Sequence, residues 1–138
     1  MAQKEIAEIE KVAKNKKMYE EAVKNIKEAK KENQIEIIFD DRIIERNYGE
    51  LEGKEYNIEY CNLDYDFESI GGESIQDYKA RLNDFILDIK KKYYDKKVLV
   101  VAHNGVISVI SCILEGEPED NNFAKRGIKN GEIKEFIF

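Results

Sequence analysis

The sequence predicts a single α/β domain over residues 1–138, with a mostly parallel β-sheet. Residues 98–102 read VLVVA, an uninterrupted apolar run that is typical of a strand buried on both faces. A second apolar pattern with helical spacing starts at Val106, directly after that run. Residues 1–34 contain no glycine, proline or phenylalanine and are rich in alanine, glutamate and lysine, which favours helix. Strands that alternate with helices are typical of α/β proteins.

The first elements along the chain follow from local spacing. Apolar residues at helical intervals predict helices over residues 2–17 and 18–32, which together form an N-terminal helical segment, residues 1–33. The run IEIIF at residues 35–39 predicts a strand, at the start of the main part of the domain, residues 34–138. Residues 43–72 hold glycines and many aromatic residues without a regular period, so we expect a long loop.

The later elements have clearer boundaries. Ser74 is a typical N-cap, and it opens a helix that continues to Tyr93. We expect residues 98–102 to form a central strand and the helix after it to end at Gly116. Asn130 and Gly131 predict a turn, and the alternation over residues 132–138 predicts a final strand.

Composition excludes several functions. The chain has 23 basic and 29 acidic residues, a net charge of −6, which disfavours nucleic-acid binding. Its sequence contains no apolar run long enough to span a membrane, and its N-terminus is charged throughout, so we expect a cytoplasmic protein without membrane partners. Cys61 and Cys112 suggest neither a disulfide nor a zinc site. His103 is the single histidine, which excludes a mechanism with two histidines from one chain, and we expect no metal or other cofactor.

Two segments are candidates for chemistry. His103, Asn104 and Gly105 lie between the predicted central strand and a helix, where ligands of open α/β sheets bind and where helix N–H groups favour anions. Glu45 follows the first predicted strand and could act as a general acid or base. Structural alternatives stay open, because the histidine could simply cap its helix and the glutamate could be a solvated loop residue. The turn at residues 71–74 is too short to be a P-loop.

The chain resembles the histidine phosphatase superfamily, the phosphoglycerate mutase-like family. The resemblance rests on DRIIERNYGELEG at residues 41–53, GES at residues 72–74 and VLVVAHNGVI at residues 98–107, in that order. It implies a reduced phosphoglycerate mutase-like three-layer sandwich, in which N-terminal helices replace the first two strands. It also implies that Glu45 is the proton donor and that His103 is the second histidine, beside the nucleophile. Arg46 then contacts substrate, with Asn104 and Gly105 beside it.

Departures from the family pattern decide the predicted function. The sequence has no Arg-His-Gly motif, which carries the family's nucleophile, and no arginine before Arg42. We therefore predict a degenerate histidine phosphatase that binds phosphate or a phosphorylated small molecule and has little or no activity alone. Whether the chain is an enzyme stays open. One alternative is an active phosphomonoesterase or phosphoglycerate mutase whose Arg-His-Gly segment comes from another chain or a missing upstream segment. Another is a protein-interaction module that recruits a partner through the N-terminal helices.

The resemblance also predicts an association. In the family sheet, the strand that matches residues 98–102 lies beside the first strand, which this chain lacks. An apolar strand with an open edge tends to be covered in proteins. The N-terminal helices, the strand at residues 35–39 or a second copy of the chain could cover it, and we expect a homodimer.

Overall fold

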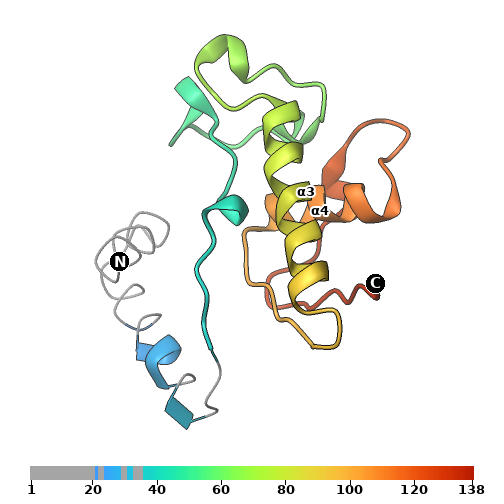
Figure 1. Ribbon diagram of the computed structural model, residues 1–138. Helices are drawn as coiled ribbons and strands as arrows, with labels where there is room; N and C mark the ends of the chain where they lie inside the picture. Colours follow the sequence, from blue (N-terminus) through green and yellow to red (C-terminus); the bar gives the residue numbers. More distant parts are fainter. Residues whose placement is uncertain (1–20, 22–23, 29–30, 33–35) are drawn as a thin grey trace. The chain divides into compact units, whose positions relative to one another are not determined.

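A computed structural model describes residues 21, 24–28, 31–32 and 36–138 of the chain (Figure 1). Its contacts divide the chain into two compact units, Met1–Asp40 and Asp41–Phe138. In the first unit, the described residues between 21 and 32 are helical, as the sequence predicts for residues 18–32. The predicted helix over residues 2–17 lies outside the described residues. Residues 36–40 follow without regular secondary structure, with Ile38 58% exposed.

The second unit consists of a looped region, two α-helices and a C-terminal segment. Its elements in order are η1 (Asp41–Ile43), η2 (Gly49–Leu51), η3 (Ile58–Cys61), η4 (Glu68–Ile70), α3 (Ile75–Lys92), α4 (Asn104–Glu115) and η5 (Phe123–Arg126). The predicted long loop is therefore present, but short 3₁₀ turns give it order. No described helix is both long and apolar enough to cross a membrane.

Helix α3 begins where the sequence predicts it. The Ser74 side chain accepts a hydrogen bond of 3.0 Å from the backbone N–H of Asp77, which satisfies one of the free donors at the helix start. The buried face consists of the side chains at helical spacing, Tyr78, Leu82, Phe85 and Ile86. These residues form one core with Val106 and Val109 of α4, and Figure 1 shows the two helices packed together.

Helix α4 is apolar on most of its surface and still contains two buried serines. Ser108 and Ser111 donate hydrogen bonds of 2.7 and 2.8 Å to the carbonyl oxygens of Asn104 and Ile107, one helical turn earlier. These bonds satisfy the buried hydroxyls without a partner from another element. The helix ends before Gly116, whose φ is +96°, as the sequence predicts.

The looped region closes on itself at two glycines. Gly49 has a φ of +59°, and a Cβ there would lie 2.2 Å from the carbonyl oxygen of Ile70 and 2.5 Å from the backbone nitrogen of Gly72. Beside this contact, the Glu73 N–H donates a 2.8 Å hydrogen bond to the Asn47 carbonyl. Only glycine fits such a close approach of two backbones. The chain before η2 and the chain before α3 are thereby held together.

The predicted parallel sheet is not formed by the described residues, so this part of the fold class stays a prediction. Residues 98–102 and 132–138 run without secondary structure, and the one isolated β-bridge joins Asn62 and Asn122. The predicted turn at residues 130–131 is present, closed by a 3.0 Å hydrogen bond from the Glu132 N–H to the Lys129 carbonyl. A β-ladder needs a second strand, and no described segment pairs with residues 98–102.

Candidate functional site

The structure brings Glu45 and His103 together from distant parts of the sequence. Glu45 follows η1, and His103 occupies the N-cap position of α4. The Nδ1 atom of His103 lies 3.8 Å from Oε2 of Glu45, with the two side chains 42% and 26% exposed. The His103 side chain makes no capping hydrogen bond, so it does not simply serve its own helix. An acid and an imidazole therefore meet at one partly open position.

The carboxylate of Glu45 is held in a fixed orientation. Its Oε1 atom accepts hydrogen bonds from the backbone N–H of Arg46 at 2.8 Å and from the Tyr78 hydroxyl at 3.2 Å. The other oxygen, Oε2, faces His103. Burial, and after it the negative charge of Glu45, raise the pKa of the Tyr78 hydroxyl, so Tyr78 remains a donor at physiological pH.

Gly105 makes room for this carboxylate. A Cβ at Gly105 would lie 2.8 Å from Oε1 and 3.0 Å from Oε2 of Glu45. The carboxylate thus lies against the first turn of α4, where N–H groups without helical partners carry a partial positive charge. Gly105 was predicted to bind substrate, and the role that its geometry supports is to admit Glu45.

Asn104 has a structural role in addition to its position in the motif. Its Oδ1 atom accepts a 3.0 Å hydrogen bond from the Ile128 N–H. A Cβ on Gly127 would lie 2.9 Å from the same oxygen, so the two segments are in close contact. Asn104 therefore fastens the chain after η5 to the start of α4, and its predicted contact with substrate stays a prediction.

Arg46 lies behind Glu45 rather than at an exposed rim. It is 2% exposed, and its Nε and Nη2 atoms donate to the Glu73 carbonyl at 3.1 and 2.9 Å. The guanidinium also lies over the Phe67 ring, 4.5 Å from the centroid. Its Nη1 atom is buried without a hydrogen-bond partner among the described residues. Burial lowers the pKa of Arg46, against the opposing effect of Tyr78 and Glu73.

Arg81 is a supporting residue that the sequence argument did not assign to the site. It makes a bidentate ion pair with Glu73, at 2.6 and 2.9 Å. It also donates to the carbonyl oxygens of Arg42 and Ile44 at 2.6 and 2.9 Å, directly before Glu45. Tyr78 was likewise expected only as a core residue. The tyrosine in an otherwise apolar helix face was the sequence signal for a polar contact, because a buried tyrosine hydroxyl normally needs a hydrogen-bond partner.

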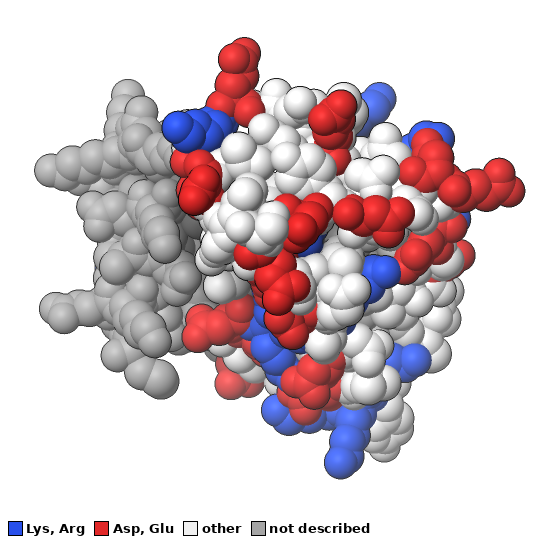
Figure 2. All heavy atoms as spheres, turned by 90° about the horizontal axis from the view of Figure 1, so that it is seen from above, with Lys and Arg blue, Asp and Glu red and all other residues white. Residues whose placement is uncertain are grey.

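The arginines of the chain are engaged within the protein. Four arginines have protein acceptors: Arg42 with Asp84 at 2.7 Å, and Arg46, Arg81 and Arg126 with backbone carbonyls. Figure 2 shows one face of the molecule on which acidic side chains are spread widely and basic ones are scattered among them. Anion attraction at Glu45 and His103 therefore depends on the imidazole and the start of α4.

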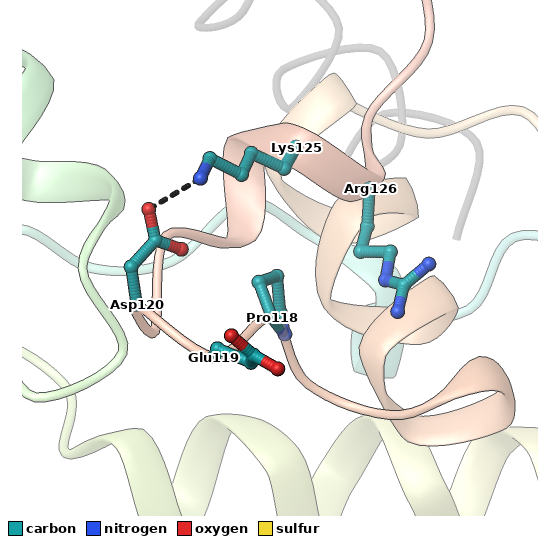
Figure 3. A pocket seen from close by; sticks show the side chains of 5 residues that line it. All are labelled: Pro118, Glu119, Asp120, Lys125 and Arg126. Atoms are coloured by element: carbon teal, nitrogen blue, oxygen red, sulfur yellow. Dashed lines mark ion pairs between the residues drawn. The ribbon is translucent and has the colours of Figure 1, made fainter.

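A separate hollow lies away from these residues, between the end of α4 and η5 (Figure 3). Pro118, Glu119, Asp120, Lys125 and Arg126 line it. Lys125 reaches across to Asp120, with 2.5 Å between Nζ and Oδ2. Both cations at the hollow have partners, since Arg126 donates to the Gly116 carbonyl. The cations at the hollow are therefore engaged within the protein. Among the described residues, no group of three or more His, Cys, Asp or Glu is suited to a metal ion.

Comparisons with known proteins agree with the order of the motifs. The family model of the histidine phosphatase superfamily (branch 1) matches residues 20–138. A protein of Hydrogenobacter thermophilus named "Putative phosphoserine phosphatase 2" is 28% identical over 91 residues, which cover 59% of this chain and 44% of the relative. The chain thus spans less than half of the length of the curated relative that it matches. No solved structure matches it significantly.

Proposed function

Since the chain belongs to the histidine phosphatase superfamily (branch 1), we propose that it binds phosphate or a phosphorylated small molecule at Glu45 and His103. The observation that carries this proposal is the 3.8 Å approach of the two side chains at the start of α4. Imidazole N–H and helix N–H groups are donors to phosphate oxygens. Both side chains are partly exposed, so a small anion can reach them.

The presence of Glu45 favours a ligand that carries a proton. A carboxylate that faces an anion repels it unless one of the two is protonated. A phosphate monoester loses its second proton near pH 6, so it can share a proton with Glu45 in mildly acidic solution (about pH 6). We expect affinity for phosphate to fall as the pH rises above this range.

The same site has little means to transfer a phosphoryl group alone. Phosphoryl transfer requires cations on the equatorial oxygens, and all four arginines of the chain have acceptors within the protein. The family's Arg-His-Gly nucleophile is absent from this sequence, and His103 is its single histidine. We infer that the chain is a degenerate member that retains the proton donor and the second histidine.

Titration with inorganic phosphate tests the binding site. At about pH 6, where phosphate can share a proton with Glu45, we expect the ring signals of His103 in NMR spectra to shift at millimolar phosphate. We expect Gly105→Ala to reduce this shift, because its Cβ displaces the carboxylate that accepts this proton. A helical alanine is otherwise favourable, so this variant should fold. Unchanged His103 signals in the wild-type protein would contradict the proposed site.

The relative's printed name favours one second candidate, an active phosphomonoesterase acting on a phosphorylated hydroxyl compound. Incubation with a labelled phosphodonor distinguishes the two. We expect no label on the protein. Acid-labile label that disappears in His103→Ala, together with phosphate release that Glu45→Gln abolishes, would establish the enzyme instead.

A further inference from the structure

The segment before His103 has no backbone hydrogen bond within the part of the chain that the structure describes. Among the described residues, none supplies a hydrogen-bond partner for the backbone N–H or C=O groups of residues 98–102. Unpaired groups of this kind form a template for another strand. The segment runs directly into the candidate site, because His103 is the next residue. Whatever pairs with the segment therefore places its own residues beside Glu45 and His103.

Side-chain exposure alternates from Leu99 to Ala102 as in a strand, whereas Val98 at the start of the segment is 46% exposed. Val100 and Ala102 pack against the core, whereas Leu99 and Val101 are 75% and 80% exposed. Alternation with a period of two is the pattern of an extended strand with one face on a core. The outer face is apolar as well, and no described residue hydrogen-bonds the backbone of this segment or buries Leu99 and Val101.

We propose that two copies of the chain associate by antiparallel pairing of residues 98–102 about a two-fold axis, and that each copy places Lys97 beside His103 of the other. The five residues are all apolar, and the register centred on Val100 is the one that pairs every apolar residue with another. In that register Leu99 lies opposite Val101 of the other copy. Two-fold symmetry satisfies both copies with the same contact.

Charge complementarity favours a second copy as the occupant. In the same register Lys97 lies opposite His103, on the face that carries Leu99 and Val101. Lys97 is exposed and has no ion pair with a described residue, and Glu45 lies 3.8 Å from the imidazole that it would approach. The association thus brings a cation to a site whose own arginines are occupied. This assignment of Lys97 to the anion site rests on the proposed function, whereas the association does not.

Sedimentation equilibrium without phosphate tests the association. We expect a dimer at micromolar concentration and a dissociation constant raised by about tenfold or more in Leu99→Glu, which puts a carboxylate in the apolar contact. Leu87→Glu is the matched control, because Leu87 is 57% exposed on α3 and lies outside the paired segment. A monomeric wild-type protein, or equal effects of the two variants, would overturn the proposal.

Cysteine cross-linking tests the register. Leu99→Cys and Val101→Cys chains, when mixed, should form a disulfide-linked dimer under mild oxidation, because these positions face each other. Each variant alone should not, since the same position in the two copies is about 7–8 Å apart diagonally, beyond disulfide reach. Cys61 and Cys112 are buried, so the wild-type protein is a suitable blank. Equal cross-linking of the single variants would overturn this register.

The contribution of Lys97 is tested last, by phosphate titration of Lys97→Gln. We expect this variant to remain dimeric and to bind phosphate about two- to fivefold more weakly, as the loss of one solvent-exposed charge pair implies. Lys92→Gln removes a lysine that already pairs with Asp88 and should leave phosphate affinity unchanged. Equal affinities of Lys97→Gln and the wild-type dimer would remove Lys97 from the site without affecting the association.

Discussion

The looped region before α3 and the segment before α4 differ in how far their polar groups have hydrogen-bond partners within the chain. Around Glu45, arginine side chains donate to nearby acceptors. Arg46 donates to the Glu73 carbonyl, and Arg81 donates to the Glu73 carboxylate and to the Arg42 carbonyl. Residues 98–102, in contrast, have backbone groups with no partner among the described residues, and Leu99 and Val101 are largely exposed. Loss of hydrogen bonding is expensive only where water is excluded. The comparison teaches that the Glu45 side of the site is held by contacts within the chain, with Nη1 of Arg46 as the exception, whereas the segment before His103 depends on what pairs with it.

Arg81→Ala should have the largest effect, because it removes the ion pair with Glu73 and the donors to two carbonyls at once. We expect a loss of about 3–5 kcal/mol in the free energy of unfolding, as for a mostly buried pair that loses one partner. Urea denaturation measures it. Lys79→Ala, which breaks the more exposed pair with Glu117, is the control and should cost about 1 kcal/mol or less. Equal losses would mean that the bonds of Arg81 to Glu73 and to the two carbonyls do not hold the looped region against α3.

A pair of leucine truncations compares the covered and uncovered parts directly. Leu82→Ala, at 0% exposure in the core, should lower the free energy of unfolding by about 2–5 kcal/mol. Leu99→Ala, at 75% exposure, should cost about 0.5 kcal/mol or less at a protein concentration below the dissociation constant. Thermal and urea unfolding at two protein concentrations check both values. A large loss for Leu99→Ala in the dilute protein would show that the segment is covered within one chain.

Several features of this region could be predicted from the sequence. Local signals identified α3 from Ser74, the end of α4 from Gly116 and the turn at residues 130–131, because caps and turns depend on neighbours in the chain. Motif order also pointed to Glu45 and His103 as a pair.

The supporting contacts were beyond that reasoning. The bond from Tyr78 to Glu45 and the burial of Arg46 arise from packing between segments about thirty residues apart, which no local period reports. The apolar run at residues 98–102 predicted a strand, but a ladder also needs a neighbour, and that depends on the rest of the assembly.

Ser74→Ala should have a smaller effect, at the junction of the looped region and α3. Loss of the 3.0 Å bond to the Asp77 N–H is expected to cost about 1 kcal/mol in the free energy of unfolding. Ser74→Asp should restore most of it, since aspartate is also an N-cap residue. Hydrogen exchange of the first turn of α3 provides an independent measure, and an unchanged exchange rate in Ser74→Ala would contradict the assigned cap.

The smallest expected effect is on how stability depends on pH in acid solution. Hydrogen bonds from Arg42, and then from Lys92, hold the pKa of Asp88 below its ordinary value of 3.8. A lowered pKa in the folded state stabilises the protein above pH 3.8, and this contribution is lost as the pH falls through the folded-state pKa. Asp88→Asn should therefore be less stable than the wild-type protein near neutral pH, with the difference shrinking below pH 3.8. A difference that does not change with pH would show that the ion pair is not its cause.

The contact between Gly49 and Gly72 determines where the chain can accept insertions. Because the backbone is already closed at Asn47 and Glu73, residues 50–70 form a side loop whose ends are fixed independently of its contents. Lengthening such a loop adds only a closure entropy of about 0.6 kcal/mol for each doubling. Insertions at the exposed residues 52–56 should thus leave the Glu45 carboxylate in place. Related chains could acquire new recognition surfaces there while the acid beside the imidazole stays where it is.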